Sequence, residues 1–459
     1  CLEIINLASN YQCNMNIYHM IQQLRPQYQA KTKQLPACIA LILVSLSGPV
    51  TAIEDEVNEF AVKGELRGGW LEYNFGNPNG DPAINKGRKD SKGFYIIPKL
   101  SVLTPKVNGF SGKITVAGAT DFGINDPDKA SSLYVYDPVE NEDFIILQEL
   151  FVEYNSGENH VLVGRNEIYT PMIEHDDYYM LANSFAVAHY KNRSINNTSI
   201  HAGYFYEMAG VWDSGANGTE FHSMSDASFV PQVNKDEADD QGVWFAAADY
   251  DDKLHNAQLW NYYATDLYNT LFAQYDYLPQ TGSVSHDFGA QFIDFSQVGK
   301  LKSSPTEIDF NVFSLRYNAT LDNGWSLATG AAKYSNGDGQ GSTLGAWGGY
   351  PYFANGMIFH FFQSGSLRDA ASYKIQGAFD FSKTTKARTS LAARYTYYDL
   401  NPEYSFSTDG QPQEYMKMLG LQLKQSYRKG GYFTGTFEKH KTDREKDAWG
   451  LRLIGGYKF

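Results

Sequence analysis

The chain has 459 residues, with 38 lysines and arginines against 52 aspartates and glutamates, which gives a formal net charge of −14. This acidic balance argues against nucleic-acid binding, because contacts with phosphates need a basic surface. The 33 tyrosines, 28 phenylalanines and 41 glycines, without an apolar stretch of helix-spanning length, are typical of a β-rich protein.

The first segment, residues 1–52, is predicted to be an N-terminal extension and secretory signal peptide. Lys31 and Lys33 precede a short apolar run that ends at Leu46, and a small-residue exit ends at Ala52. About ten apolar residues are too few to span a bilayer, which needs roughly 20, so we predict cleavage after Ala52 rather than a membrane anchor. Removing three basic residues and one acidic residue from the totals leaves a net charge of −16 for residues 53–459, which are predicted to be one domain.

No cofactor and no metal are expected in that domain. All three cysteines precede the predicted cleavage point, at Cys1, Cys13 and Cys38. A disulfide scaffold and a cysteine-ligated metal site are therefore both excluded. Asp249, Asp251 and Asp252 have oxygen-rich spacing, but no calcium-binding loop surrounds them, and we interpret them as a periplasmic turn.

Segments of alternating polarity recur along the rest of the chain, the period-two pattern of a half-buried strand. Apolar residues or glycines occupy every second position from Tyr373 to Phe381, and again from Trp449 to Phe459. A transmembrane barrel would turn the apolar face to lipid and the polar face to its lumen. A soluble β-sandwich would bury the apolar faces in a shared core. The export signal, the aromatic richness and the terminal strand favour the barrel.

The predicted fold class is therefore all-β, a transmembrane antiparallel β-barrel of about eighteen strands. The expected strands are 60–75, 93–103, 110–121, 143–155, 160–166, 185–190, 197–207, 242–250, 256–264, 270–277, 287–296, 307–319, 325–334, 371–382, 387–398, 414–427, 431–440 and 447–459.

The connections between these strands alternate in length. Hairpin turns such as Ser156–Asn159 and Asp322–Gly324 are short, whereas 208–241 and 335–370 are long, and 265–269 is the exception. Short periplasmic turns and long outer loops are typical of transmembrane barrels. The sequence therefore predicts an integral protein of the bacterial outer membrane in a Gram-negative cell.

Short stretches of the sequence resemble OprD-type outer-membrane porins. Val163–Arg165, Tyr169–Met172 and Leu181–Phe185 are similar to the region of the third outer loop of that family, and Trp347–Phe353 to a late outer loop. The end of the chain, with alternating apolar residues and an aromatic last residue, resembles the signal read by the barrel-assembly machinery; its aromatic members are Tyr457 and Phe459. The resemblance implies a substrate-selective channel narrowed by its third and seventh outer loops.

An eighteen-stranded barrel encloses a lumen too wide to discriminate small solutes, so loops must narrow it. The residues predicted to form the pore constriction lie in the third outer loop: Glu174, Asp176, Asp177, Tyr178 and Tyr179. Alternation directs a basic wall inward, formed by Lys63, Arg67, Lys99, Arg316, Lys374, Arg394, Lys424, Arg452 and Lys458. The inward acids are Glu65, Glu149, Glu153, Asp309, Asp380 and Glu438. A basic wall opposite an acidic loop would orient dipolar or carboxylate-bearing solutes, although any one wall charge could simply be solvated and paired.

The predicted function is passive diffusion of ions and small hydrophilic solutes, with carboxylates, amino acids and peptides as candidates, and without enzymatic activity. The expected partners are outer-membrane lipid and lipopolysaccharide, the solutes, and the barrel-assembly machinery during biogenesis, whereas no nucleic acid is expected. The sequence leaves monomer and homotrimer open. The alternatives are a barrel-embedded hydrolase, for which nine histidines are candidates but no Gly-x-Ser-x-Gly motif is present, and a surface adhesin that uses the long loops.

Overall fold

The computed structural model describes residues 59–130, 143–177, 180–210, 220–225, 241–303, 309–337, 347–349, 351–358 and 367–459. Within these ranges the chain forms one antiparallel sheet of twenty strands. Two of them, β8 (His222–Ser223) and β12 (Gln280–Thr281), have two residues each, which leaves eighteen long strands. This number agrees with the prediction from the sequence.

The long strands follow one another along the chain. Their bounds are β1 (Ala61–Asn74), β2 (Ser91–Leu103), β3 (Phe110–Ala119), β4 (Phe144–Ser156), β5 (Asn159–Asn166), β6 (Ser184–Asn192), β7 (Thr198–Ala209), β9 (Val243–Asp251), β10 (His255–Ala264), β11 (Tyr268–Tyr277), β13 (Val284–Gln297), β14 (Phe310–Leu321), β15 (Trp325–Tyr334), β16 (Ala371–Asp380), β17 (Thr389–Asp399), β18 (Tyr415–Ser426), β19 (Gly431–Thr442) and β20 (Ala448–Lys458).

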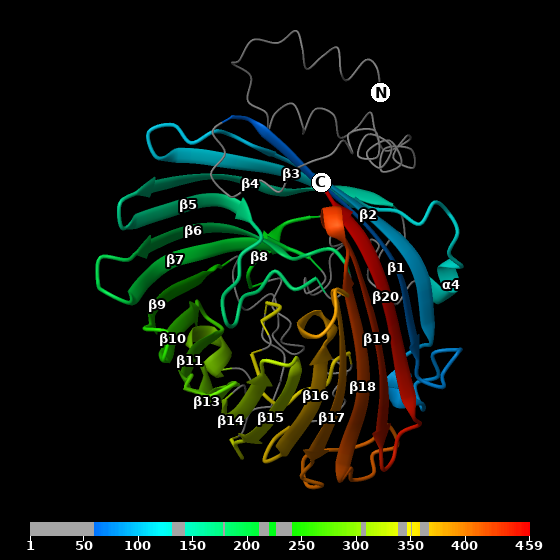
Figure 1. The fold of residues 1–459 in the computed structure, drawn as a ribbon. Coiled ribbons are helices and arrows are strands. Elements are labelled where there is room, and N and C mark those ends of the chain that lie inside the picture. Colours follow the sequence, from blue (N-terminus) through cyan, green and yellow to red (C-terminus); the bar gives the residue numbers. More distant parts are fainter. Residues whose placement is uncertain are drawn as a thin grey trace.

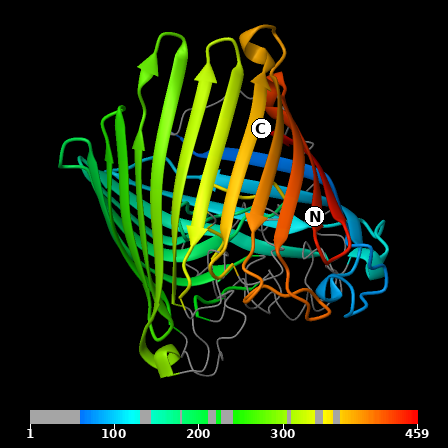
Figure 2. The ribbon, with the colours of Figure 1, turned by 90° about the horizontal axis from the view of Figure 1, so that it is seen from below.

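The sheet closes on itself. Each long strand pairs antiparallel with the next long strand, and β20 pairs with β1, where Leu71 lies opposite Arg452. Figure 1 shows the red β20 beside the blue β1, and Figure 2 shows the green to orange strands standing side by side across the lumen from the blue and cyan ones. Because a closed barrel has no free edge, every strand can satisfy its backbone groups without water.

The predicted strand boundaries differ from the observed ones by at most three residues, at Val284 and Phe310. The two-residue strands were not predicted, because two residues are too few to show a period. One predicted inward residue is wrong: Asp309 precedes β14, and its carboxylate accepts a hydrogen bond from the Gln297 backbone N–H at 2.7 Å. It therefore belongs to the connection between β13 and β14 rather than to the wall.

The barrel is apolar outside and mixed inside. Tyr373 and Ile375 on β16 and Leu419 and Leu421 on β18 are among its exposed large apolar side chains. Their strand neighbours at alternate positions, such as Lys374, face the lumen. An apolar outer face with a polar lumen is the arrangement of membrane-spanning barrels.

The hairpin turns explain why the strands reverse where they do. β4 and β5 are joined by a two-residue loop whose first residue, Gly157, has φ +56°, and Gly324 between β14 and β15 has φ +99°. A side chain at Gly324 would also collide with the Asp380 carbonyl oxygen, 2.4 Å from an ideal Cβ. Positive φ and close backbone approach both favour glycine in such turns.

Helices are short and lie in connections: α4 (Pro127–Ala130) and the 3-10 turns η2 (Asn85–Gly87), η3 (Gly299–Ser303), η5 (Phe381–Lys383) and η6 (Arg428–Gly430). In the described part of the chain, no helix is both long enough and apolar enough to cross a membrane.

The last residue completes the seam of the barrel. The Phe459 N–H donates to the Gly64 carbonyl oxygen at 2.9 Å, and the Gly64 N–H donates to the Phe459 carbonyl oxygen at 2.8 Å. An ideal Cβ on Gly64 would lie 2.2 Å from the Phe459 ring, so the ring packs directly over this glycine, 6.3 Å from the Tyr457 ring.

Deleting Phe459 is therefore expected to lower the amount of membrane-inserted barrel sharply while export continues, because it removes two seam hydrogen bonds together with the terminal aromatic side chain. The measurement is the fraction of heat-modifiable protein in outer-membrane and periplasmic extracts. A Phe459→Tyr variant, which keeps the ring and the backbone, is the control. Unchanged insertion of the truncated chain would show that Phe459 has no part in assembly.

Candidate functional site

A cavity of about 900 Å³ lies inside the barrel. Residues of β5–β7, β9–β11 and β14–β16 form its wall. It is covered by Tyr169–Pro171 and Glu174 of the third loop (167–183) and by Pro351–Phe353 of the seventh loop (335–370). Its lining extends from Tyr169 and Tyr352 on these loops to Lys191 and Arg193 near the turn between β6 and β7. Because charged, amide and aromatic side chains line this space within the lumen, it is the candidate solute path.

The third loop is tied to the barrel wall near both of its ends. Lys99 on β2 forms an ion pair with Glu167. Near the other end, Arg67 on β1 binds Asp177, with 2.8 Å between Nη2 and the carboxylate oxygen, and Nη1 donates to the Met180 carbonyl oxygen at 2.8 Å. These contacts hold the loop inside the lumen on the β1–β2 side.

The seventh loop packs directly on the third. The Glu174 N–H donates to the Trp347 carbonyl oxygen at 3.2 Å, and the buried Trp347 ring stacks on Tyr268 with 5.5 Å between centroids. An ideal Cβ on Gly349 would lie 2.3 Å from the Met172 carbonyl carbon. Only glycine at position 349 permits this approach, which joins the two loops into one cover.

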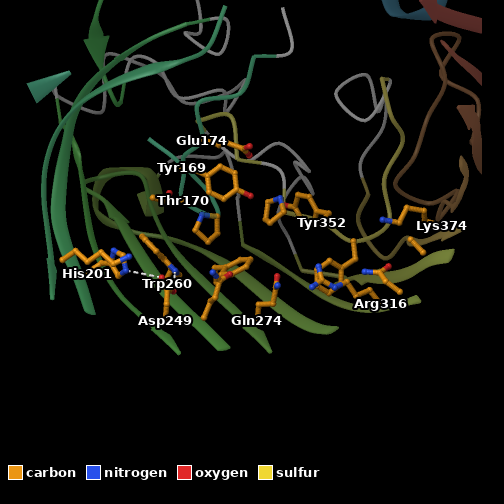
Figure 3. A pocket seen from close by; sticks show the side chains of 18 of the residues that line it. Tyr169, Thr170, Glu174, His201, Asp249, Trp260, Gln274, Arg316, Tyr352 and Lys374 are labelled. Atoms are coloured by element: carbon orange, nitrogen blue, oxygen red, sulfur yellow. Dashed lines mark hydrogen bonds and ion pairs between the residues drawn. The ribbon is translucent and has the colours of Figure 1, made fainter. Parts of the chain in front are cut away.

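The cover and the wall present different chemistry to the cavity. Tyr169, which is 68% exposed, and Glu174 project from the third loop, and Figure 3 shows them across the cavity from Gln274 and Arg316. A solute between them would meet a phenol and a carboxylate on one side and amide and guanidinium groups on the other.

The two cations on the β14–β16 part of the lining differ in their partners. The Arg316 guanidinium pairs with Asp276 at 2.8 Å and with Asp287 at 3.2 Å, and lies 4.6 Å from the centre of the Phe353 ring. The Lys374 ammonium makes no ion pair or hydrogen bond with the described residues and lines the cavity. Of these two cations, Lys374 is therefore the one more able to bind an anionic solute.

A row of polar side chains in close contact crosses the opposite part of the wall. His189 Nε2 lies 3.0 Å from His201 Nδ1, and His201 Nε2 lies 3.2 Å from the Asp249 carboxylate. That carboxylate also accepts a hydrogen bond from Trp260 Nε1 at 2.8 Å. Among the described residues, no group of histidines, cysteines and carboxylates has the arrangement of a metal site. The row offers rigid polar groups to the lumen instead.

The residues predicted to form the constriction are placed as follows. Glu174 lines the cavity, Asp177 pairs with Arg67, and the Asp176 carbonyl oxygen accepts a hydrogen bond from the Asn183 N–H at 3.2 Å. Tyr178 and Tyr179 lie outside the described residues.

The predicted basic wall faces inward by strand register but is divided among several tasks. Arg67 and Lys99 hold the third loop, Arg394 contacts the seventh loop, and Arg316 and Lys374 line the cavity. The remaining members of the predicted wall also face inward and lie outside the lining: Lys63, Lys424, Arg452 and Lys458. Arg67 thus contacts an acid of the third loop, whereas Arg316 and Arg394 bind other groups.

Sequence reasoning missed several residues of the lining. Asp249 lies on β9 and faces the lumen, so the periplasmic-turn interpretation is wrong for it, although Asp252 does form that turn by accepting hydrogen bonds from the Leu254 and His255 N–H groups. The available signal was the period of the strand, because Asp249 lies two and four residues after Ala247 and Phe245 and so shares their face of β9. Tyr169 was also missed, because a loop residue carries no periodicity.

The pairing of Asp177 leads to an expected pH dependence. Burial would by itself raise the pKa of this carboxyl group, but the charges of Arg67 and Arg452 and the hydrogen bond from Arg67 outweigh it, so the pKa lies below its ordinary value. The contact is then complete above the ordinary carboxyl pKa of about 4 and is lost only as pH falls through the lowered value.

Hydrogen exchange of peptides from 167–183, corrected for intrinsic rates, is therefore expected to be equal at pH 7.5 and pH 5. Asp177→Asn should exchange faster at both pH values, because a neutral amide cannot replace the ion pair with Arg67. Peptides from β13, a strand of the barrel wall, provide the internal control. Faster exchange of the parent segment at pH 5 would contradict the lowered pKa.

Comparisons with known proteins agree on the fold. No family model matches the sequence, and no curated protein matches it. Among solved structures it is similar to OccK9 (OpdG) of Pseudomonas aeruginosa, with 14% identity, a TM-score of 0.72, and coverage of 88% of this chain and 100% of that one. OccAB4 of Acinetobacter baumannii gives 14% identity, a TM-score of 0.70, and coverage of 88% and 99%. OccK2 (OpdF) of P. aeruginosa, solved with glucuronate, gives 15% identity, a TM-score of 0.66, and coverage of 88% and 99%. The fold is therefore that of outer-membrane channels of the Occ/OprD type.

Proposed function

We propose that the chain is an outer-membrane channel for passive diffusion of small hydrophilic solutes that carry a carboxylate group. The observation that carries this proposal is the cavity of about 900 Å³ inside a closed barrel, beneath two loops that fold into the lumen. A cavity of this volume accommodates a small polar molecule. The barrel interior provides the aqueous route, and the loops provide the selection.

The charge of the lining supports the choice of solute. Lys191, Arg193 and Lys374 are lining cations, whereas Arg316 is compensated by two carboxylates. A carboxylate can bind Lys374 from the lumen, and Tyr169 and Glu174 across the cavity suit hydroxyl groups or an ammonium group on the same solute. The solved complex of OccK2 with glucuronate suggests a sugar acid as a first probe.

The test is the swelling of liposomes that contain the full-length protein, in isosmotic glucuronate and in isosmotic glucose, two solutes of similar size. We expect the ratio of the swelling rate in glucuronate to that in glucose to be higher for protein-containing liposomes than for empty liposomes, which report lipid leakage alone. Empty liposomes are the control, and heat-modifiability shows that the barrel has inserted. Equal swelling of empty and protein-containing liposomes in both solutions would reject the proposed function.

A further inference from the structure

The middle of the seventh loop, 351–358, lies flat against the barrel wall, bound mainly through its backbone. Its Ala354 carbonyl oxygen accepts hydrogen bonds from the Ser372 hydroxyl at 3.1 Å and from the Tyr398 hydroxyl at 3.3 Å. The Asn355 carbonyl oxygen accepts one from the Thr396 hydroxyl at 2.9 Å. Side chains of β16 and β17 therefore hold the segment by its backbone carbonyl oxygens, which a residue of any type would offer.

Two charged side chains complete these contacts with opposite signs. Arg394 on β17 donates from Nη1 to the Gly356 carbonyl oxygen at 2.9 Å. Glu438 on β19 accepts from the Met357 N–H at 2.7 Å and from the Ile358 N–H at 2.6 Å. Hydrogen bonds to charged groups are about twice as strong as neutral ones. The cation thus binds a carbonyl oxygen and the anion binds the N–H groups that follow it.

The burial of Glu438 indicates that this side chain binds the loop rather than a solute. The side chain is completely buried, and a buried carboxylate is costly unless hydrogen bonds and a nearby cation compensate it. The two loop N–H groups supply the hydrogen bonds, and Arg394 lies near enough to interact with it electrostatically. Such a carboxylate is not available to a passing solute.

Glycines on the wall leave room for the segment. An ideal Cβ on Gly330 of β15 would lie 2.6 Å from the Phe353 carbonyl oxygen, and one on Gly420 of β18 would lie 2.7 Å from the Met357 sulfur. An alanine at Gly330 would therefore force backbone to move. The wall from β15 to β19 thus fits this segment in two ways: its glycines leave space for the segment, and its charged side chains bind the segment's backbone.

We infer that Glu438 and Arg394 are positioning residues that fix 354–358 on the β16–β19 wall and so confine the solute path to the β5–β16 side of the lumen. The cavity agrees with this placement, because its described lining contains no residue of β1–β4 or of β17–β20. On the β1–β2 side, the contacts of Arg67 with Asp177 and Met180 hold the third loop against the wall in a similar way. The confinement of the solute path rests on the proposed function, whereas the fixing of residues 354–358 on the wall does not.

Accessibility of a cysteine under the loop tests the fixing directly. In a background with Cys1, Cys13 and Cys38 replaced by serine, Ser372→Cys places a nearly isosteric thiol on the wall beneath Ala354, where Ser372 is fully buried. Ser326→Cys, on the open cavity lining, is the matched control for entry of the reagent. The readout is the rate of modification by a small charged thiosulfonate reagent in folded, heat-modifiable protein.

Glu438→Gln should raise the modification rate at position 372 on the order of tenfold, because a glutamine can accept only one of the two N–H groups and its NH2 group opposes the other. Position 326 should be unaffected. Glu438→Asp, which keeps the charge, should restore much of the protection. Arg394→Gln serves if Glu438→Gln does not fold, and should also expose position 372. An unchanged rate at position 372 with normal modification at position 326 would overturn the fixing by these residues.

Single-channel recordings of the same variants test the path. Glu438→Gln should shift both the conductance and the reversal potential, because the segment no longer closes the β16–β19 side. If position 372 becomes reactive while both values match the parent, the confinement of the path is wrong. If the parent itself does not conduct, the proposed function fails, and the modification rates still decide whether Glu438 fixes the loop.

Discussion

Replacing Arg316 by glutamine is expected to shift ion selectivity strongly toward cations, because it leaves the carboxylates of Asp276 and Asp287 without their shared guanidinium. A charge about 6 Å from a permeating ion is worth about 0.7 kcal/mol in water, so the loss of one positive charge favours a cation and disfavours an anion by about that amount each. Their relative affinity therefore changes by about tenfold at low salt. Screening reduces the effect when the ionic strength approaches 1 M.

The reversal potential under a salt gradient measures this shift. The Arg316→Gln/Asp276→Asn double variant is the matched control, because it restores the net charge of the parent cluster and should return most of the change. Arg316→Lys should stay close to the parent, since it keeps the positive charge. A reversal potential for Arg316→Gln equal to the parent value at low salt would show that permeating ions do not pass this part of the wall.

Replacing Lys374 by glutamine is expected to slow the entry of carboxylate-bearing solutes by about threefold at low salt, the factor that corresponds to one charge about 6 Å from the solute in water. The ammonium group lines the cavity and has no acidic partner among the described residues, so no carboxylate of the wall neutralises it. Glucose entry should be unchanged, because a neutral solute has no net charge for Lys374 to attract.

The swelling rate of liposomes in glucuronate against that in glucose measures this change. Lys424→Gln removes an equal charge from an inward-facing but exposed position outside the cavity lining, and is the control. Equal effects of the two substitutions would mean that general lumen charge, rather than binding at Lys374, attracts the solute.

The sequence predicts the strands of this fold well, because a barrel wall requires alternation along every strand and the alternation is visible locally. Tyr373 and Lys374 point to opposite faces as their polarity suggests, and Arg452 and Leu453 do the same. The exceptions are short or lie outside strands. The two-residue β8 and β12 have no period to detect, and Asp309 lies just before a strand.

The partners of the inward residues were not predictable in the same way. Asp276 and Asp287 meet Arg316 from two other strands, and Glu438 meets a loop 80 residues away. Such contacts depend on strand register and on how loops fold into the lumen, and the local pattern contains neither. Strand alternation therefore indicates the face on which a charge lies, with Asp309 as an exception, but it could not show which charges hold loops and which remain available to a solute.

Single-channel recording of the full-length protein in a planar bilayer tests the central claim most directly. A channel should give discrete conductance steps of uniform size in salt solution, each from one inserted barrel. Protein that is heat-modifiable and inserted in the membrane, yet gives no steps above the leak of the lipid alone, would contradict it.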